Sequence, residues 1–262
     1  MNIEQLEARF KALEKENKDL QKKVVTFEEE NKALQKKVTT LEDIEAIKKI
    51  QRAYGFYLEH MMADEVADLW AEDGELQWSG LGVFKGRETI RKCWTLLKEW
   101  ASHQGRPELQ LHITMMTSPY ITVSTDGNKA WGRWYVRGGS AGGQGLYENE
   151  YVKENGIWKI KIISIGGFGL TLPGQENMDP AQIERDIQTH MSGYPFSERW
   201  SRSPRQEASN WIRPFHFKHP VTGKDVNRKV EAWNKAHPDP LPPGGDNWLT
   251  RPQLDAPPLE RH

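Results

Sequence analysis

The sequence predicts an α+β fold for residues 43–170, in which helices cover one face of an antiparallel sheet. Two observations predict it: amphipathic helical segments come first, and three long segments with strand-type alternation follow them. Helices followed by strands are typical of α+β domains. A third observation, a heptad repeat over residues 1–42, places a coiled coil before this domain, and a proline-rich extension follows it at residues 171–262.

The heptad repeat runs through six heptads without a break. The a positions are Ile3, Phe10, Asn17, Val24, Asn31 and Val38, and the d positions are Leu6, Leu13, Leu20, Phe27, Leu34 and Leu41. A seven-residue apolar period winds helices into a left-handed coiled coil. Three g-to-e′ pairs are attractive in a parallel arrangement: Arg9–Glu14, Lys23–Glu28 and Lys37–Glu42. We expect self-association through this segment. A parallel dimer fits best, and the two phenylalanines in the seam leave a trimer as the alternative.

The middle region contains the elements of a complete domain. We expect a helix over 44–61, a short helix over 64–72, a hairpin over 74–86, a helix over 86–100, and strands within 108–124, 129–139 and 145–165, the last split by a turn at Asn155-Gly156.

The last region, residues 171–262, holds 13 of the 15 prolines. We expect one helix over 179–190, with Asp179 as its N-cap and Pro180 in its first turn. Beyond it we expect an extended tail that packs over the domain or over a neighbouring subunit. Within this tail, the stretch "WIRPFHFKHPVTG" is a candidate lid over a pocket.

Composition limits the class of protein. The 36 basic and 37 acidic residues nearly balance, so charge provides no general attraction to nucleic acid or to an anionic membrane. No apolar run approaches the ~20 residues of a membrane span, and the charged N-terminus does not resemble a signal peptide. The single cysteine, Cys93, excludes an intrachain disulfide. We therefore expect a cytoplasmic protein without nucleic-acid or membrane partners.

Four stretches resemble the SnoaL-like branch of the nuclear transport factor 2-like superfamily. They are "IKKIQRAYGFYLEHMMADEVADLWAEDGELQW", "GVFKGRETIRKCW", "TSPYITVSTDGNKAWGRWYV" and "GLYENEYVKENGIWKI". The resemblance implies a curved antiparallel sheet, wrapped by helices into a cone with an apolar pocket inside. It covers dehydratases such as scytalone dehydratase, a dehydrochlorinase, polyketide cyclases, ketosteroid isomerases, formaldehyde-releasing lyases of lignin-derived diaryl compounds, and binding proteins without chemistry. Fold alone does not select among them.

Strand alternation predicts which side chains point into the cone. The inward set is His112, Thr114, Met116, Ser118, Gly132, Trp134, Val136, Gly145, Tyr147, Asn149, Tyr151, Ile163 and Ile165, with Leu76 and Trp78 together on one face of the hairpin. Arg133 and Arg137 face outward on this parity. A large aromatic interior with few polar groups is typical of a small-molecule site.

The resemblance also implies a catalytic pair, a carboxylate at the end of the first helix and a histidine on the strand after the third helix. The carboxylate position falls on Glu59, or on Met62 when the first helix is counted as longer. The histidine position falls on Thr114, and His112 lies two residues earlier on the same face. We take His112 as the base and Glu59 as its partner or as the acid. The alternative is a solvated Glu59 and a hydrogen-bonded core His112.

The other candidate residues surround this pair. Tyr54 and Tyr57 would position or polarise a substrate oxygen, and the substrate-binding candidates are Trp78, Trp134, Tyr147, Asn149, Met62, Met116 and Thr114. We expect no metal, because His216 and His219 stand in the tail without a supporting cluster of ligands. We expect no organic cofactor, because no dinucleotide-binding fingerprint is present.

These observations favour a cofactor-independent lyase acting on a bulky hydrophobic, phenolic or aromatic substrate. The reaction would be a β-elimination, either dehydration or carbon–carbon cleavage that releases formaldehyde. The alternatives are a binding protein for an apolar small molecule, an isomerase or cyclase of the same fold, and a scaffold whose main function is the coiled coil.

Overall fold

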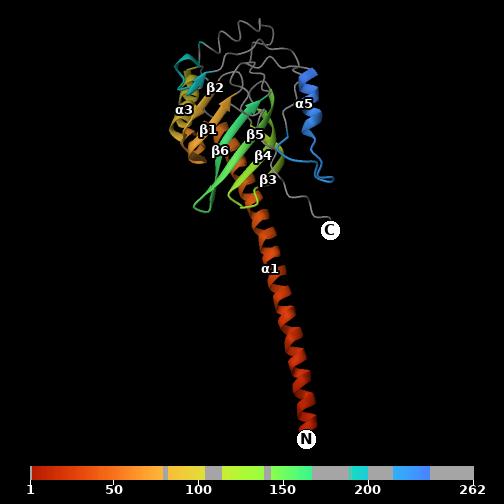
Figure 1. The fold of residues 1–262 in the computed structure, drawn as a ribbon. Helices are drawn as coiled ribbons and strands as arrows, with labels where there is room; N and C mark the ends of the chain where they lie inside the picture. The colour runs from red at the N-terminus through yellow and green to blue at the C-terminus, as the bar shows by residue number, and fades with distance from the viewer. Residues whose placement is uncertain are drawn as a thin grey trace. The chain divides into compact units, whose positions relative to one another are not determined.

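The computed structural model describes residues 2–78, 82–103, 114–138, 143–166, 189, 191–199 and 215–236. Figure 1 shows the helices and strands of these segments. The chain divides into two compact units, Met1–Asp43 and Ile44–His262. No helix in the described segments is long and apolar enough to cross a membrane.

Helix α1 (Ile3–Glu59) is one continuous element. The sequence suggested a heptad segment followed by a separate helix, but neither glycine nor proline occurs before Gly55 to interrupt the helix. Within the second unit, α1 buries Ile47, Gln51, Tyr54 and Leu58. Their spacing of three and four residues places them on one face of the helix.

The end of α1 lies in the stretch "YGFYLEHMM" and closes with a Schellman motif. The backbone N–H of Met62 donates to the carbonyl of Tyr57 (3.0 Å), and that of Met61 donates to the carbonyl of Leu58 (3.1 Å). Met61 has a φ of 50°, where glycine is usual, and its side chain is 1% exposed. Burial of this side chain offsets the backbone cost. The motif fixes Glu59 in the last turn of the helix.

Helix α2 (Ala63–Asp68) leads into strand β1 (Trp70–Trp78), which pairs with β2 (Gly82–Lys85). The short helix ends earlier than predicted, because Trp70 pairs with Ile160 and the N–H of Ile160 donates to the Leu69 carbonyl at 2.8 Å. The hairpin is confirmed. Helix α3 (Arg87–His103) follows.

The sheet has the strand order β3-β4-β5-β6-β1-β2-β7. The remaining strands are β3 (Met115–Val123), β4 (Lys129–Gly138), β5 (Gly143–Glu154), β6 (Ile157–Gly166) and β7 (Glu198–Arg199). The α+β class is confirmed, but the sheet is mixed, because β1 and β6 run parallel. Only strands joined by a short turn must be antiparallel, and α3 and four strands separate this pair in the chain.

The inner face of the sheet carries the core that alternation predicted. Its buried members are Leu76, Trp134, Val136, Tyr147, Asn149, Tyr151, Ile163 and Ile165, and Gly132 and Gly145 are buried beside them. The prediction for Ser118 is wrong, because this residue is exposed. It has a φ of 50° and lies at an irregularity of β3 between Thr117 and Tyr120, which breaks the alternation.

The outer face of the sheet is covered by part of the C-terminal region. Arg133 lies there as predicted, yet it is only 8% exposed, because it pairs with Glu148 and its guanidinium lies 4.2 Å from the centre of the Phe215 ring. His216 Nδ1 lies 2.9 Å from Glu148 Oε2. This part of the "WIRPFHFKHPVTG" stretch therefore packs on the face opposite the inner core and does not lid it.

Helix α5 (Asn227–Ala236) is an element that the sequence reading missed. The Asn227 side chain links it to the preceding segment, because its Oδ1 accepts from the Phe215 N–H (2.9 Å) and its Nδ2 donates to the Phe215 carbonyl (2.8 Å). The 3-10 turn η1 (Met191–Gly193) precedes β7. The helix predicted over 179–190 and the glycine-rich stretch 139–142 lie outside the described residues.

Candidate functional site

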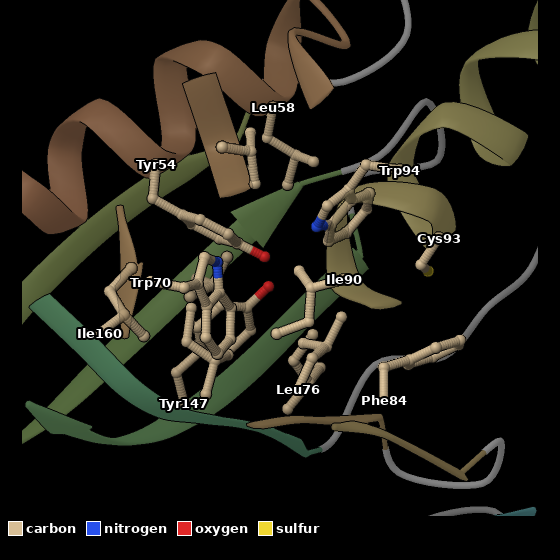
Figure 2. Packing of buried hydrophobic residues seen from close by; sticks show 14 of the residues in the cluster. Tyr54, Leu58, Trp70, Leu76, Phe84, Ile90, Cys93, Trp94, Tyr147 and Ile160 are labelled. Atoms are coloured by element: carbon tan, nitrogen blue, oxygen red, sulfur yellow. The ribbon is translucent and has the colours of Figure 1, made fainter. Parts of the chain in front are cut away.

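Four aromatic residues from four elements meet inside the domain. Tyr54 of α1 makes edge contacts with Trp70 of β1 and Trp94 of α3, with ring centroids 6.4 Å apart in both pairs. Tyr147 of β5 belongs to the same buried cluster. Figure 2 shows the Tyr54 hydroxyl pointing between the two indole rings. Apolar neighbours such as Leu58 and Ile90 complete the surroundings, so this centre is aromatic and shielded from water.

Three polar atoms of this centre are buried without a hydrogen-bond partner among the described residues: Tyr54 Oη, Trp70 Nε1 and Trp94 Nε1. We name them the unpaired cluster. The two indole nitrogens are donors only, and a phenol both donates and accepts. A buried polar group without a partner costs about 1–3 kcal/mol. Three such atoms around one aromatic centre leave three donors that no described residue uses, all in an apolar interior.

The phenols at this centre stay protonated at neutral pH. Burial raises the pKa of Tyr54 well above its ordinary value, and the neighbouring Tyr147 and Cys93 raise it further. Burial also raises the pKa of Tyr147. A neutral phenol retains its proton for donation. The Tyr54 hydroxyl therefore keeps its proton at neutral pH.

A second polar group lies on the same inner face, and its members bond to one another. The hydroxyl of Tyr151 accepts from Trp134 Nε1 (3.0 Å) and donates to Gln51 Oε1 (2.7 Å), and Asn149 Nδ2 donates to the same Gln51 oxygen (2.9 Å). We name Gln51, Trp134, Asn149 and Tyr151 the paired network. It ties α1 to β4 and β5. Asn149 Oδ1 is its one atom that is buried without a partner among the described residues.

Close backbone approach makes the paired network possible. A Cβ on Gly132 would lie 2.8 Å from Trp134 Nε1 and 3.1 Å from a ring carbon of Tyr151. Real Cβ atoms essentially never approach another atom to 2.8 Å. Glycine at 132 therefore gives the indole and the phenol the space in which they meet.

Glu59, the last residue of α1, contacts the residue that precedes strand β3. Its Oε1 accepts the backbone N–H of Thr114 at 2.9 Å. Gly55, one turn earlier in α1, allows this approach, since a Cβ there would lie 2.9 Å from the Thr114 carbonyl oxygen. His112 lies outside the described residues, so the predicted pair of Glu59 and His112 stays a prediction. Glu59 therefore contacts Thr114, which follows His112 by two positions in the sequence.

The other predicted residues lie around the two groups. Tyr57 is half-buried against the core, and Trp78 is half-buried with its ring centroid 5.8 Å from that of Trp94. Met116 Sδ accepts from Gln51 Nε2 at 3.1 Å, and Met62 is half-buried. Tyr54, Trp134, Tyr147, Asn149 and Thr114 are buried. Trp134 and Asn149 belong to the paired network, and Tyr54 belongs to the unpaired cluster.

Sequence reasoning missed Trp70, Trp94 and Gln51. Gln51 falls on the buried stripe of α1, three residues before Tyr54, and Trp94 falls one turn after Ile90 in α3. Helical periodicity could have indicated both. Trp70 was predicted to lie in the short helix, so the burial of its side chain at the start of strand β1 was not predicted.

The outer face carries a hollow of about 490 Å³ lined in part by Trp131, Lys161 and His216. Among the lining residues, Lys161 forms an ion pair with Asp73, and Glu154 forms one with Lys159, which lies outside the lining. His216 pairs with Glu148, whereas His219 Nδ1 accepts the N–H groups of Val221 and Thr222. The two histidines thus have different partners, and the described residues contain no cluster suited to a metal.

Comparison with known proteins agrees with this architecture. Residues 39–163 match the family model of the SnoaL-like domain. The match spans a little under half of the chain, and this part of the chain is therefore similar to the SnoaL-like domain. No curated protein matches the chain.

Several solved structures are similar. A protein of unknown function from Mycobacterium tuberculosis is 19% identical, with 60% of this chain and 98% of that chain covered and a TM-score of 0.46. A putative scytalone dehydratase from Novosphingobium aromaticivorans is 19% identical, with 52% and 94% covered and a TM-score of 0.41. A hexachlorocyclohexane dehydrochlorinase (LinA) is 18% identical, with 53% and 99% covered and a TM-score of 0.41. These likenesses concern the fold alone.

Proposed function

We propose that the protein is a cofactor-independent lyase that acts on a bulky aromatic substrate with a phenol or carbonyl oxygen. The observation that carries the proposal is the unpaired cluster, three polar atoms buried in an aromatic interior without a hydrogen-bond partner among the residues that the structure describes. An aromatic substrate matches the rings of Tyr54, Trp70 and Trp94. A substrate oxygen matches their donors.

The chemistry follows from where negative charge develops. In a β-elimination next to a carbonyl, a base removes the proton on the adjacent carbon and the carbonyl oxygen gains enolate charge. The electron pair then expels the β-hydroxyl, which takes a proton from an acid and departs as water. In formaldehyde release, the base removes the hydroxyl proton, the carbon–carbon bond breaks to give formaldehyde, and the electron pair of that bond moves through the conjugated system onto a carbonyl oxygen of the substrate. Both routes increase charge on an oxygen. Fixed indole and phenol donors in a water-poor site stabilise that charge.

The base is the second requirement. We assign it to His112, with Glu59 as the group that orients it or supplies a proton. Glu59 supports this assignment because it lies in the last turn of α1 and bonds to the start of β3. The C-terminal end of a helix is an electrostatically unfavourable place for a carboxylate, so a partner with positive charge would be stabilised there.

One observation favours a second candidate, a non-catalytic binding protein for an aromatic small molecule. Glu59 Oε1 is already engaged by the Thr114 N–H. A carboxylate used only to fix β3 would leave the unpaired cluster as a binding site without a base. The cytoplasmic location and the three-part division of the chain stay predictions.

The test incubates the purified full-length protein, without added cofactor, with phenolic diaryl-propanoids and hydroxylated polycyclic compounds. Mass spectrometry then detects loss of water or of formaldehyde. We expect turnover that His112→Ala and Glu59→Gln abolish and Tyr54→Phe reduces. Tyr135→Phe is the matched control, because Tyr135 is 61% exposed. Turnover that survives both His112→Ala and Glu59→Gln would contradict the mechanism, and unchanged but retained compounds would establish the binding protein.

A further inference from the structure

The heptad segment of α1 exposes a long apolar stripe that two asparagines interrupt. Ten of its twelve a and d positions are exposed large apolar residues, namely Ile3, Leu6, Phe10, Leu13, Leu20, Val24, Phe27, Leu34, Val38 and Leu41. The other two positions are Asn17 and Asn31. An exposed apolar surface of this extent marks an interaction site, because water contact with it is unfavourable.

The charges beside the stripe complement a second copy of the same segment. In a parallel pair, g positions face the e positions of the next heptad in the partner helix. Three of these pairs join opposite charges, Arg9–Glu14, Lys23–Glu28 and Lys37–Glu42, and each occurs twice in a symmetric pair. The other three, Asn2–Glu7, Glu16–Gln21 and Glu30–Gln35, contain no like-charged contact. A second copy therefore fits this stripe without repulsion.

The two asparagines discriminate between orientations. In a parallel, in-register pair, each Asn17 and each Asn31 meets its own symmetry mate, and the two amides bond to each other. In an antiparallel pair with full overlap, a positions face d positions. Asn17 would then face Phe27, and Asn31 would face Leu13. Neither partner offers an acceptor or donor, so the buried amides would lose their hydrogen bonds.

We propose that residues 3–41 form a parallel, in-register, two-stranded coiled coil with a second copy of the chain. β-Branched residues occupy a at Ile3, Val24 and Val38, while leucine occupies five of the six d positions. This combination favours two strands over three or four. The proposal is independent of the proposed activity and concerns the first unit of the chain.

Two adjacent valines provide the sharpest test. Val24 is an a residue and Val25 a b residue, and both are 54% exposed in the single chain. Light scattering of the full-length protein measures its mass. We expect a dimer for the wild type and for Val25→Lys, and a much larger dissociation constant for Val24→Lys. Near-ultraviolet circular dichroism checks that both variants retain a folded second unit. A wild-type mass of one or three chains, or equal behaviour of the two variants, would overturn the proposal.

A cross-link tests the orientation. Asn31→Cys introduces a thiol on the seam, and native Cys93 does not compete because it is buried. Under mild oxidation we expect Asn31→Cys alone to form a disulfide-linked dimer, since parallel a positions bring the same residue of two chains together. If Asn31→Cys fails to link while Leu13→Cys/Asn31→Cys succeeds, the pair is antiparallel and the proposed orientation is wrong.

Discussion

The paired network and the unpaired cluster lie on the same inner face and share helix α1, yet they differ in hydrogen bonding. Gln51 of the network and Tyr54 of the cluster are three residues apart. Both groups contain a fully buried tyrosine. The Tyr151 hydroxyl bonds to Trp134, Asn149 and Gln51, whereas the Tyr54 hydroxyl has no partner in the described part of the chain.

This difference separates structural from functional polar groups. The hydrogen bonds of the paired network offset the free-energy cost of burying its polar groups, and they hold α1 against the sheet. An unbonded group has a cost that the fold alone does not offset, and such exceptions to local consistency are expected at functional sites. We infer that the network supports the architecture and that the cluster binds a ligand oxygen.

The largest effect is expected at alkaline pH, where both groups contribute. Burial raises the pKa of Tyr54, Tyr147 and Tyr151 in the folded state. Below pH about 10 these tyrosines are protonated in both states. Above it, the unfolded tyrosines lose protons that the folded ones keep. The free energy of unfolding should therefore fall by about 1.4 kcal/mol per pH unit for each tyrosine.

Urea unfolding at a series of pH values measures this slope. Tyr151→Phe and Tyr54→Phe should each reduce this slope by about 1.4 kcal/mol per pH unit, the contribution of one tyrosine. A slope that stays flat above pH about 10 in the wild type would contradict the burial of these phenols.

The second effect concerns the space for the paired network. Gly132→Ala would place a Cβ 2.8 Å from Trp134 Nε1 and displace the indole from Tyr151. Overpacking of this kind should lower the free energy of unfolding by about 3 kcal/mol. Thermal denaturation of Gly193→Ala provides the control, because no atom lies within 4 Å of a Cβ at that position. Equal stability of the two variants would show that the network tolerates an added methyl group.

The third effect concerns the hub of the paired network. Tyr151→Phe removes the acceptor of Trp134 Nε1 and a donor to Gln51 Oε1. The indole N–H then stays buried without a partner, so the free energy of unfolding should fall by about 2 kcal/mol. Urea unfolding at neutral pH measures it. A loss below about 0.5 kcal/mol would mean that the network contributes little to the fold.

The smallest change in stability is expected in the unpaired cluster. Tyr54→Phe removes a hydroxyl that has no partner among the described residues, so no hydrogen bond is lost. The free energy of unfolding should change by less than about 0.5 kcal/mol. A loss as large as that of Tyr151→Phe would reveal a hidden structural partner of the Tyr54 hydroxyl.

Much of this architecture is predictable from local sequence pattern. The hairpin, the helix after it, the Asn155-Gly156 turn and the inward positions of Trp134, Tyr147 and Asn149 follow from periodicity and turn chemistry. The parallel pairing of β1 with β6 does not follow, because it joins segments that are distant in the chain. The irregularity of β3 at Ser118 was not predicted either. One extra residue in the strand reverses the inward and outward alternation, and the sequence pattern does not show where that residue lies.

The candidate site was predictable only in part. Tyr54 and Tyr147 follow from periodicity, but the hydrogen-bonding state of a buried group is a tertiary property. No pattern distinguishes Tyr54 from Tyr151 before the fold is known. Likewise, Arg133 has the pattern of an outward, solvated residue, and only the contacts with Glu148 and Phe215 show that it is buried.

The most direct test measures the affinity of 2-naphthol, with naphthalene as the matched ligand lacking oxygen, by isothermal titration calorimetry. If the unpaired cluster binds a ligand oxygen, the wild type and Tyr151→Phe should prefer 2-naphthol, and Tyr54→Phe should lose about tenfold in affinity for it alone, corresponding to about 1.4 kcal/mol. If Tyr54→Phe binds 2-naphthol as tightly as the wild type does, the Tyr54 hydroxyl does not bind the oxygen, and the central distinction between the two groups is wrong.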